Sequence, residues 1–253
     1  MIVVKVGGAE GINVENTVKD LASYEKFVLV HGGSGEVNRL QTKLGVPPRM
    51  VTSVSGYTSR FTDKRKMVCG GKINKEIVQM FQQLGVNAIG LSGVDGRLLE
   101  ARRKDAIKIV ENGKKKVLRG DFTGKVESVN VRLLDSLLEN GYVPVIAPIA
   151  ITQENVAVNV DGDRAAAAIA GALNAESLII LSNVPGLMNL RTNEVIAKIS
   201  VGDCMEYAEG RMRKKILGAK EALEAGIDRV ILGDANVENP VTGAIQGAGT
   251  VIV

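Results

Sequence analysis

Two short glycine-rich turns each follow a run of apolar residues, and each has a polar residue beside it. The first turn, Gly7-Gly8, comes directly after residues 2–6, a run that contains Lys5. The second follows residues 27–30 and reads His-Gly-Gly-Ser over residues 31–34. Glycines placed after a buried strand let backbone N–H groups approach an anion closely. With Lys5 as a point charge between them, the two turns predict a site for phosphoryl transfer.

Two carboxylates stand where a short strand leads into an alanine-rich segment. Asp161 and Asp163 follow Asn159 at this junction. Carboxylates at a helix start can cap the helix and favour its dipole. Alternatively, Asp163 orients lysines around a transferring phosphate, while Asn159 contacts the substrate. The local sequence leaves both interpretations open.

A cluster of basic residues opens a later helix. Residues 210–215 read Gly-Arg-Met-Arg-Lys-Lys. Cations at a helix N-terminus oppose the helix dipole, and an anion bound there would remove that penalty. Lys215 is therefore a candidate for contacting a phosphate oxygen, whereas Arg213 and Lys214 fit a solvated basic stretch.

Three other polar residues have an ordinary structural explanation beside a functional one. Arg60 lies in a loop and suits bidentate binding of a carboxylate, or else a surface salt bridge. His31 is the single histidine of the chain, and a turn histidine is more typical of a hydrogen-bonded structural residue than of a general base. Ser34 fits a helix N-cap better than a nucleophile, because no triad context surrounds it.

These residues need a scaffold that brings the ends of several strands together, and the rest of the chain predicts one. Apolar runs alternate with amphipathic segments, which is typical of an α/β protein. We expect a three-layer αβα sandwich with a mainly parallel open sheet, whose ligands gather at the carboxyl ends of strands. The predicted strands are residues 2–6, 27–30, 87–91, 143–147, 177–181, 229–232 and 250–253. The predicted helices are residues 14–24, 34–44, 62–84, 131–139, 161–173 and 211–225.

Positive charge is concentrated in one segment. Residues 102–119 contain eight basic and two acidic residues, so the remainder of this chain of net charge +4 carries −2. Within that segment, residues 107–110 and 115–118 flank Asn112-Gly113, which predicts a β-hairpin. Such a patch is a solvated face or a docking site for an acidic partner.

Composition excludes several classes of protein. The chain has 253 residues, of which 45% are hydrophobic and 24% charged, and no apolar run reaches the length of a membrane span. Cys69 and Cys204 match no metal spacing and are expected to be reduced and buried. Aromatic residues make up 3% of the chain, which is unfavourable for a nucleic-acid module that stacks bases. We expect a cytoplasmic protein with no signal peptide, no membrane partner and no nucleic-acid partner.

Seven ordered segments resemble the amino acid kinase family, and acetylglutamate kinases in particular. They are residues 5–8, 31–33, 88–96, 141–148, 159–163, 181–187 and 210–215. The resemblance implies a single kinase domain over residues 1–253. In it, a lobe of about residues 1–150 would bind the acceptor and form a homodimer, and a lobe of about residues 151–253 would bind ATP.

The resemblance also implies roles for individual residues. Lys5 and Lys215 match the lysines that stabilise the transferring phosphoryl group, and Asp163 matches the aspartate that organises them. Mg²⁺ is expected to arrive with ATP rather than at a metal site of the protein. The residues matched to phosphate and nucleotide binding are Gly7, Gly8, Gly32, Gly33, Ser182, Asn183 and Gly186. Those matched to substrate binding are Gly33, Ser34, Arg60 and Asn159.

Three departures resemble a carrier-dependent branch of the family, of the archaeal aminoadipate/glutamate kinase type. They are Ser34 in place of a glycine, the Asp161-Gly162 pair, and a longer loop around Arg60. In that branch the acceptor is 2-aminoadipate or glutamate joined to LysW, a small acidic carrier protein, and the product serves lysine or arginine biosynthesis. The basic hairpin would then dock the carrier through Lys114, Lys115, Lys116 and Arg119. The alternatives are an acetylglutamate kinase, another family branch, and a nucleotide-binding regulator without catalysis.

Overall fold

A computed structural model describes residues 1–45, 63–104, 106–111, 114–120 and 122–253. Its largest element is an eight-stranded sheet in the order β12-β14-β13-β11-β1-β2-β8-β3. Neighbouring strands run parallel throughout this sheet except β13 and β14. The strands are β1 (Ile2–Val6), β2 (Phe27–His31), β3 (Ala88–Ser92), β8 (Val143–Ala147), β11 (Ser177–Ser182), β12 (Lys198–Ile199), β13 (Val230–Asp234) and β14 (Thr250–Ile252).

Helices cover both faces of this sheet. Alternate residues of β1 point to opposite faces, so Val4 packs in one hydrophobic cluster and Val3 in another. The Val4 cluster includes residues of α1 (Val14–Leu21), α4 (Asn74–Gln83) and α8 (Pro240–Ile245). The Val3 cluster includes residues of α5 (Val131–Glu139), α6 (Gly162–Ala172) and α7 (Met212–Glu224). The predicted three-layer αβα sandwich is confirmed.

The helix predicted over residues 62–84 contains a wider turn than expected. It begins within the described residues at Asp63, continues as a π-helix, η1 (Lys66–Ile73), and becomes α-helical in α4. Gly70 and Gly71 lie inside η1. Val68 and Cys69 of η1 pack against Val37 of α2 (Ser34–Lys43). The π-helix therefore contacts the helix that follows the second glycine turn.

A second sheet was not predicted from the sequence. It has four short strands in the order β10-β9-β4-β7. The strand β10 ends at Asn159, shortly before α6 begins, so this sheet fixes where α6 begins. Its strands are β4 (Leu99–Arg103), β7 (Gly124–Val129), β9 (Ile149–Ile151) and β10 (Ala157–Asn159). The described residues also contain two 3₁₀ turns, η2 (Asp95–Arg97) and η3 (Cys204–Glu206).

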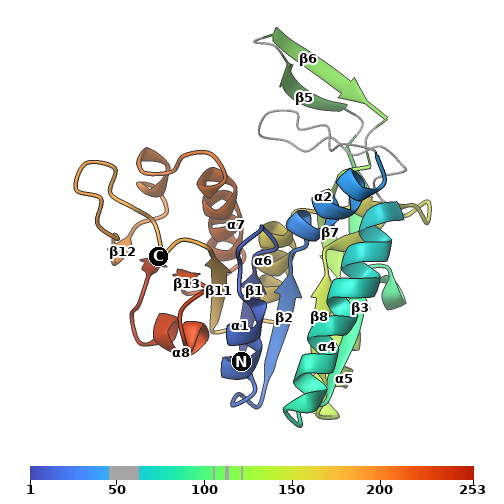
Figure 1. Cartoon of the computed structure of the whole chain (residues 1–253), viewed down its shortest axis with the longest axis horizontal. Helices are drawn as coiled ribbons and strands as arrows, with labels where there is room; N and C mark the ends of the chain where they lie inside the picture. Colours follow the sequence, from blue (N-terminus) through green and yellow to red (C-terminus); the bar gives the residue numbers. More distant parts are fainter. Residues whose placement is uncertain (46–62, 105, 112–113, 121) are drawn as a thin grey trace.

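The predicted hairpin is present as β5 (Ala106–Glu111) and β6 (Lys114–Arg119). The two strands pair antiparallel, with Glu111 opposite Lys114. Figure 1 shows the hairpin at the top of the molecule, standing away from the large sheet.

Cys69 and Cys204 are both buried and free, as expected. No helix in the described ranges is long and apolar enough to span a bilayer.

Candidate active site

Three charged residues that are far apart in the sequence meet at the carboxyl edge of the large sheet. Lys5 of β1 points to the same face as Val3, where α6 and α7 lie. The Lys5 Nζ is 2.6 Å from Asp163 Oδ1, an ion pair without hydrogen-bond geometry. The Lys215 Nζ approaches the other oxygen, Asp163 Oδ2, at 3.6 Å. One carboxylate therefore lies between two ammonium groups, all three nearly buried.

The charges of this trio shift the proton equilibria of its members. Burial by itself would raise the pKa of Asp163, but the positive charges of Lys5 and Lys215 outweigh it and hold that pKa below its ordinary value. Burial and the nearby charge of Lys5 lower the pKa of Lys215, while Asp163 acts in the opposite direction. The Asp163 carboxylate thus helps to keep a second lysine charged close to the first.

The structure separates the two interpretations of the carboxylates at the start of α6. Asp161 is the N-cap: its Oδ1 accepts hydrogen bonds from the backbone amides of Asp163 at 3.0 Å and Arg164 at 3.2 Å. Asp163 lies two residues further on, within the first turn of α6, and faces the lysines instead. Capping therefore belongs to Asp161, and Asp163 is free to orient Lys5 and Lys215.

The two glycine turns are packed backbone against backbone. A Cβ atom placed on Gly8 would lie 1.8 Å from the amide nitrogen of Gly33. One placed on Gly32 would lie 2.5 Å from the amide nitrogen of Gly8. No side chain fits at either position without moving the opposite turn, and this close approach explains why glycine is required.

Two of the four backbone amides of the glycine turns already donate to carbonyls of the sheet, so only the other two remain for an anion. The Gly7 amide donates to the carbonyl of Leu181 and the Gly32 amide to the carbonyl of Val6, both at 2.9 Å. Within the described part of the chain, the amides of Gly8 and Gly33 have no such partner. Gly7 and Gly32 thus tie the turns to the sheet, and Gly8 and Gly33 remain as candidate donors to phosphate.

The expectation that Ser34 is a helix N-cap is wrong. Gly33 occupies the cap position of α2, and Ser34 is the first helical residue. Its hydroxyl donates to the carbonyl of Gly8 at 3.1 Å, so it joins the two turns.

A cavity of about 460 Å³ brings residues of both predicted lobes together. Ser34 lines it from α2, and Asn183 lines it from the loop after β11. Sequence analysis missed three cations in this cavity, Arg39, Lys43 and Arg211, of which Arg211 belongs to the basic stretch before α7. Only the arrangement of α2 beside that loop shows them together. Glu10 also lines this cavity and Arg39 pairs with Glu36, but the net charge of the lining is positive and suits an anionic ligand.

The remaining expected ligand contacts are buried. Asn159 is 5% exposed, and its Oδ1 has no hydrogen-bond partner among the described residues. Such an atom is costly to leave unpaired, and a bound ligand would satisfy it. Ser182 is likewise buried at the end of β11. A Cβ on Gly186 would meet Thr250 Oγ1 at 2.6 Å, so close packing requires glycine there.

His31 is a structural residue, as predicted. It is buried, with its Nδ1 2.8 Å from the carbonyl of Gly32 and its Nε2 3.2 Å from Asn74 Nδ2. The carbonyl accepts and the amide donates, so Nδ1 carries the proton in this arrangement. Burial, opposed by the Gly32 hydrogen bond and assisted by the charge of Lys5, lowers the pKa of His31 to about 4. The ring's one acceptor nitrogen, Nε2, is occupied by Asn74, and burial makes the imidazole a weak base, so His31 is poorly suited to general-base catalysis.

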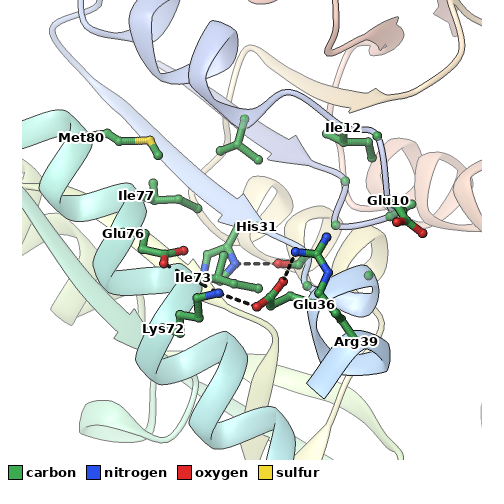
Figure 2. Close-up of a pocket in the computed structure, with 18 residues that line it drawn as sticks. Glu10, Ile12, His31, Glu36, Arg39, Lys72, Ile73, Glu76, Ile77 and Met80 are labelled. Atoms are coloured by element: carbon green, nitrogen blue, oxygen red, sulfur yellow. Dashed lines mark hydrogen bonds and ion pairs between the residues drawn. The ribbon is translucent and has the colours of Figure 1, made fainter. Parts of the chain in front are cut away.

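His31 also borders a cavity of about 280 Å³ behind the glycine turns. Figure 2 shows Glu36 between Lys72 and Arg39 at one side of this cavity, with Ile77 and Met80 of α4 further along it. Arg39 Nη1 is 3.1 Å from Glu36 Oε2, and Lys72 pairs with Glu36 Oε1. The Lys72–Glu36 bridge connects η1 to α2, and the Arg39–Glu36 bridge lies within α2.

Some predicted residues cannot be placed. Arg60 lies outside the described residues. The backbone of Lys114, Lys115, Lys116 and Arg119 forms β6, but their side chains are outside the description. In the ranges that the structure covers, no three or more His, Cys, Asp and Glu side chains are grouped so that they could hold a metal ion.

The sequence profile of the amino acid kinase family matches residues 1–234. A protein of Deinococcus radiodurans named [LysW]-aminoadipate kinase is 53% identical over 266 residues, covering 100% of this chain and 91% of its own. A [LysW]-aminoadipate/[LysW]-glutamate kinase of Metallosphaera sedula is 40% identical and covers 100% of both chains. Among solved structures, carbamate kinase of Giardia lamblia bound to AMP-PNP superposes with a TM-score of 0.68, at 16% identity, over 100% of this chain and 98% of its own. That structural likeness shows the fold.

Proposed function

The chain belongs to the amino acid kinase family, and we propose that it phosphorylates the side-chain carboxylate of aminoadipate, of glutamate, or of both, joined to LysW. ATP is the phosphoryl donor and an acyl phosphate is the product. Relatives named for LysW-linked acceptors are 53% and 40% identical to this chain over its full length, which supports the choice of acceptor. The observation that carries the reaction type is the trio of Lys5, Asp163 and Lys215 beside two glycine turns.

The chemistry needs no general base, because a carboxylate is already ionised at pH 7. One carboxylate oxygen forms a bond to the γ-phosphorus while the bond from that phosphorus to the bridging oxygen of ADP breaks. Lys5 and Lys215 balance the negative charge on the transferring group, and the amides of Gly8 and Gly33 donate to its oxygens. Catalysis of this kind rests on positioning and charge stabilisation.

Mg²⁺ is best supplied by the nucleotide. The buried carboxylate nearest the reaction centre, Asp163, already pairs with two lysines. Mg²⁺ carried by the nucleotide would neutralise phosphate charge.

The lobes take different roles in this proposal. Residues up to about 150 carry the acceptor side, and residues from about 151 carry Asn159 and the nucleotide loop after β11. Arg60 would hold the acceptor's carboxylate side, and Asn159 would use its unpaired Oδ1 to bind the acceptor. We place the enzyme in the cytoplasm as a homodimer, in lysine biosynthesis, arginine biosynthesis or both.

The acceptor is tested by a hydroxamate assay with ATP and four substrates: aminoadipate and glutamate, each linked to LysW, and the N-acetyl form of each. We expect acyl phosphate from a LysW-linked acceptor, with kcat/KM at least about tenfold above that for either N-acetyl amino acid, because the carrier adds contacts that the small acceptor lacks. Equal or higher efficiency with free N-acetylglutamate would instead make the chain an acetylglutamate kinase.

Carrier docking is tested by reversing charge on the hairpin. Changing Lys114, Lys115 and Lys116 together to Glu should raise KM for a LysW-linked acceptor by about tenfold or more at low salt, because like charges then face an acidic partner. KM for ATP should be nearly unchanged, and so should the thermal midpoint, because the hairpin stands away from the large sheet (Figure 1).

Salt supplies a control for that experiment. Raising ionic strength should increase the carrier KM of the wild type toward that of the triple variant, because salt screens charges at the rim of an interface. A carrier KM that stays the same in the triple variant at low salt would show that the hairpin is a solvated face.

A further inference from the structure

The first turns of α6 and α7 approach each other closely at a glycine. A Cβ atom on Gly218 of α7 would lie 3.2 Å from both the carbonyl carbon and the Cβ of Asp163, and 3.3 Å from its carbonyl oxygen. Two of these three atoms are backbone, so they cannot rotate away as the end of a long side chain would. The space that Gly218 leaves is therefore filled by the start of α6 itself.

Gly218 follows Lys215 by three positions on the same helix. Residues three apart lie on the same face of an α-helix, one turn from each other. The face that brings Gly218 against Asp163 is thus the face from which Lys215 reaches the same aspartate, at 3.6 Å. Any outward shift of α7 at Gly218 would move the Lys215 ammonium away from Asp163 and from Lys5.

A second contact fixes the same pair of helices. Arg164, next to Asp163 on α6, donates from Nε to Glu221 Oε2 at 2.7 Å and pairs through Nη2 with Glu221 Oε1. Glu221 is one turn beyond Gly218 on α7. A bidentate pair of this kind fixes orientation as well as distance. Together the Arg164–Glu221 pair and Gly218 define how close α6 and α7 lie and how they are rotated relative to each other.

We propose that Gly218 is a positioning residue for the phosphoryl transfer. Its missing side chain lets α7 come near enough to α6 for Lys215 and Lys5 to share one carboxylate. The inference rests on the proposed function, because it assigns Gly218 a role through Lys215. Gly218 itself does not touch the reacting groups.

The same helix pair contains a matched control. A Cβ on Gly171, in the last turns of α6, would lie 2.5 Å from the Cβ of Ala225 at the end of α7. This contact is tighter than the one at Gly218, but it lies eight residues along α6 from Asp163, about 12 Å at the helical rise. A substitution at Gly171 therefore disturbs the packing of the same two helices far from the lysines.

The experiment compares Gly218→Ala, Gly218→Val and Gly171→Ala in the full-length enzyme. We expect Gly218→Ala to lower kcat several-fold and Gly218→Val by about 10- to 30-fold, because displacements well under an ångström already weaken a positioned catalytic group. KM for ATP should change by less than about threefold, since the nucleotide loop is untouched. Gly171→Ala should lower the thermal midpoint at least as much and leave kcat within about twofold of wild type.

A crystal structure of each variant gives a readout that does not depend on activity. In Gly218→Val the distance from Lys215 Nζ to Asp163 Oδ2 should exceed 3.6 Å, whereas Gly171→Ala should keep it. An unchanged distance in Gly218→Val would overturn the inference, whichever acceptor the enzyme uses. So would equal losses of kcat in Gly218→Val and Gly171→Ala. A wild type that phosphorylates none of the acceptors would contradict the proposed function instead.

Discussion

Lys5→Ala and Lys215→Ala should each lower kcat by about 10²–10³-fold, with a much smaller change in KM for ATP. Both ammonium groups are nearly buried beside Asp163, where water screens them poorly. Negative charge on the transferring phosphoryl group increases in the transition state. A fixed cation there therefore stabilises the transition state more than it stabilises the complex with bound ATP. Steady-state release of ADP with a LysW-linked acceptor measures both constants.

Methionine at the same positions separates charge from packing. Lys5→Met and Lys215→Met keep most of the side-chain volume while removing the charge, so they should lose as much kcat as the alanine variants. Thermal midpoints of all four proteins show whether the fold persists. Turnover near the wild-type level in either methionine variant would mean that its lysine has no part in stabilising the phosphoryl group.

Changing Asp163 to Asn should lower kcat by about 10²-fold, although it removes only one charge. The helix start is preserved, because Asp161 and not Asp163 caps α6. Without the carboxylate, Lys5 and Lys215 repel each other in a buried place, and an uncompensated buried charge is strongly unfavourable. The pKa of Lys215, already lowered by burial and by Lys5, loses the influence of Asp163 that raises it. We therefore also expect a lower thermal midpoint.

Asp20 provides the control for that substitution. It too is a buried aspartate, and its Oδ2 accepts hydrogen bonds from the amides of Val241 at 2.7 Å and Thr242 at 2.8 Å, at the start of α8. Asp20→Asn should reduce the thermal midpoint and leave kcat nearly unchanged. If Asp163→Asn behaved in the same way, Asp163 would be a structural residue and the lysines would not need it for orientation.

The features that sequence predicted are those decided by neighbouring residues. A buried parallel strand is a short apolar run, and β1, β2, β8 and β11 each read as one. The glycines after β1 and β2 marked the turns, and the position of His31 inside such a turn predicted a hydrogen-bonded structural residue. Local pattern was therefore enough to place Lys5 at a strand end and Lys215 in the first turn of a helix.

The features it did not predict depend on residues far apart in the chain. The strands of the second sheet are short, and β4 pairs with β7 and β9, so no single segment shows the sheet. The two roles of Asp161 and Asp163 were open in the sequence, because either could cap, and only the positions of β1 and α7 decide between them. The role of Gly218 was likewise invisible, since a lone glycine in a helix gives no sign of what lies against it. Which turn amides remain for an anion also depended on partners in other strands, Leu181 and Val6.

The backbone packing of the two glycine turns has a consequence for the entropy of nucleotide binding. At the contact between Gly8, Gly32 and Gly33 there are no side-chain rotamers to freeze, and the turns are already tied to the sheet. A phosphate group that arrives there orders almost nothing, so little of its attraction to the amides is offset by lost conformational freedom. Affinity for the polyphosphate should then resist changes elsewhere in the chain, as long as the two turns keep each other in place.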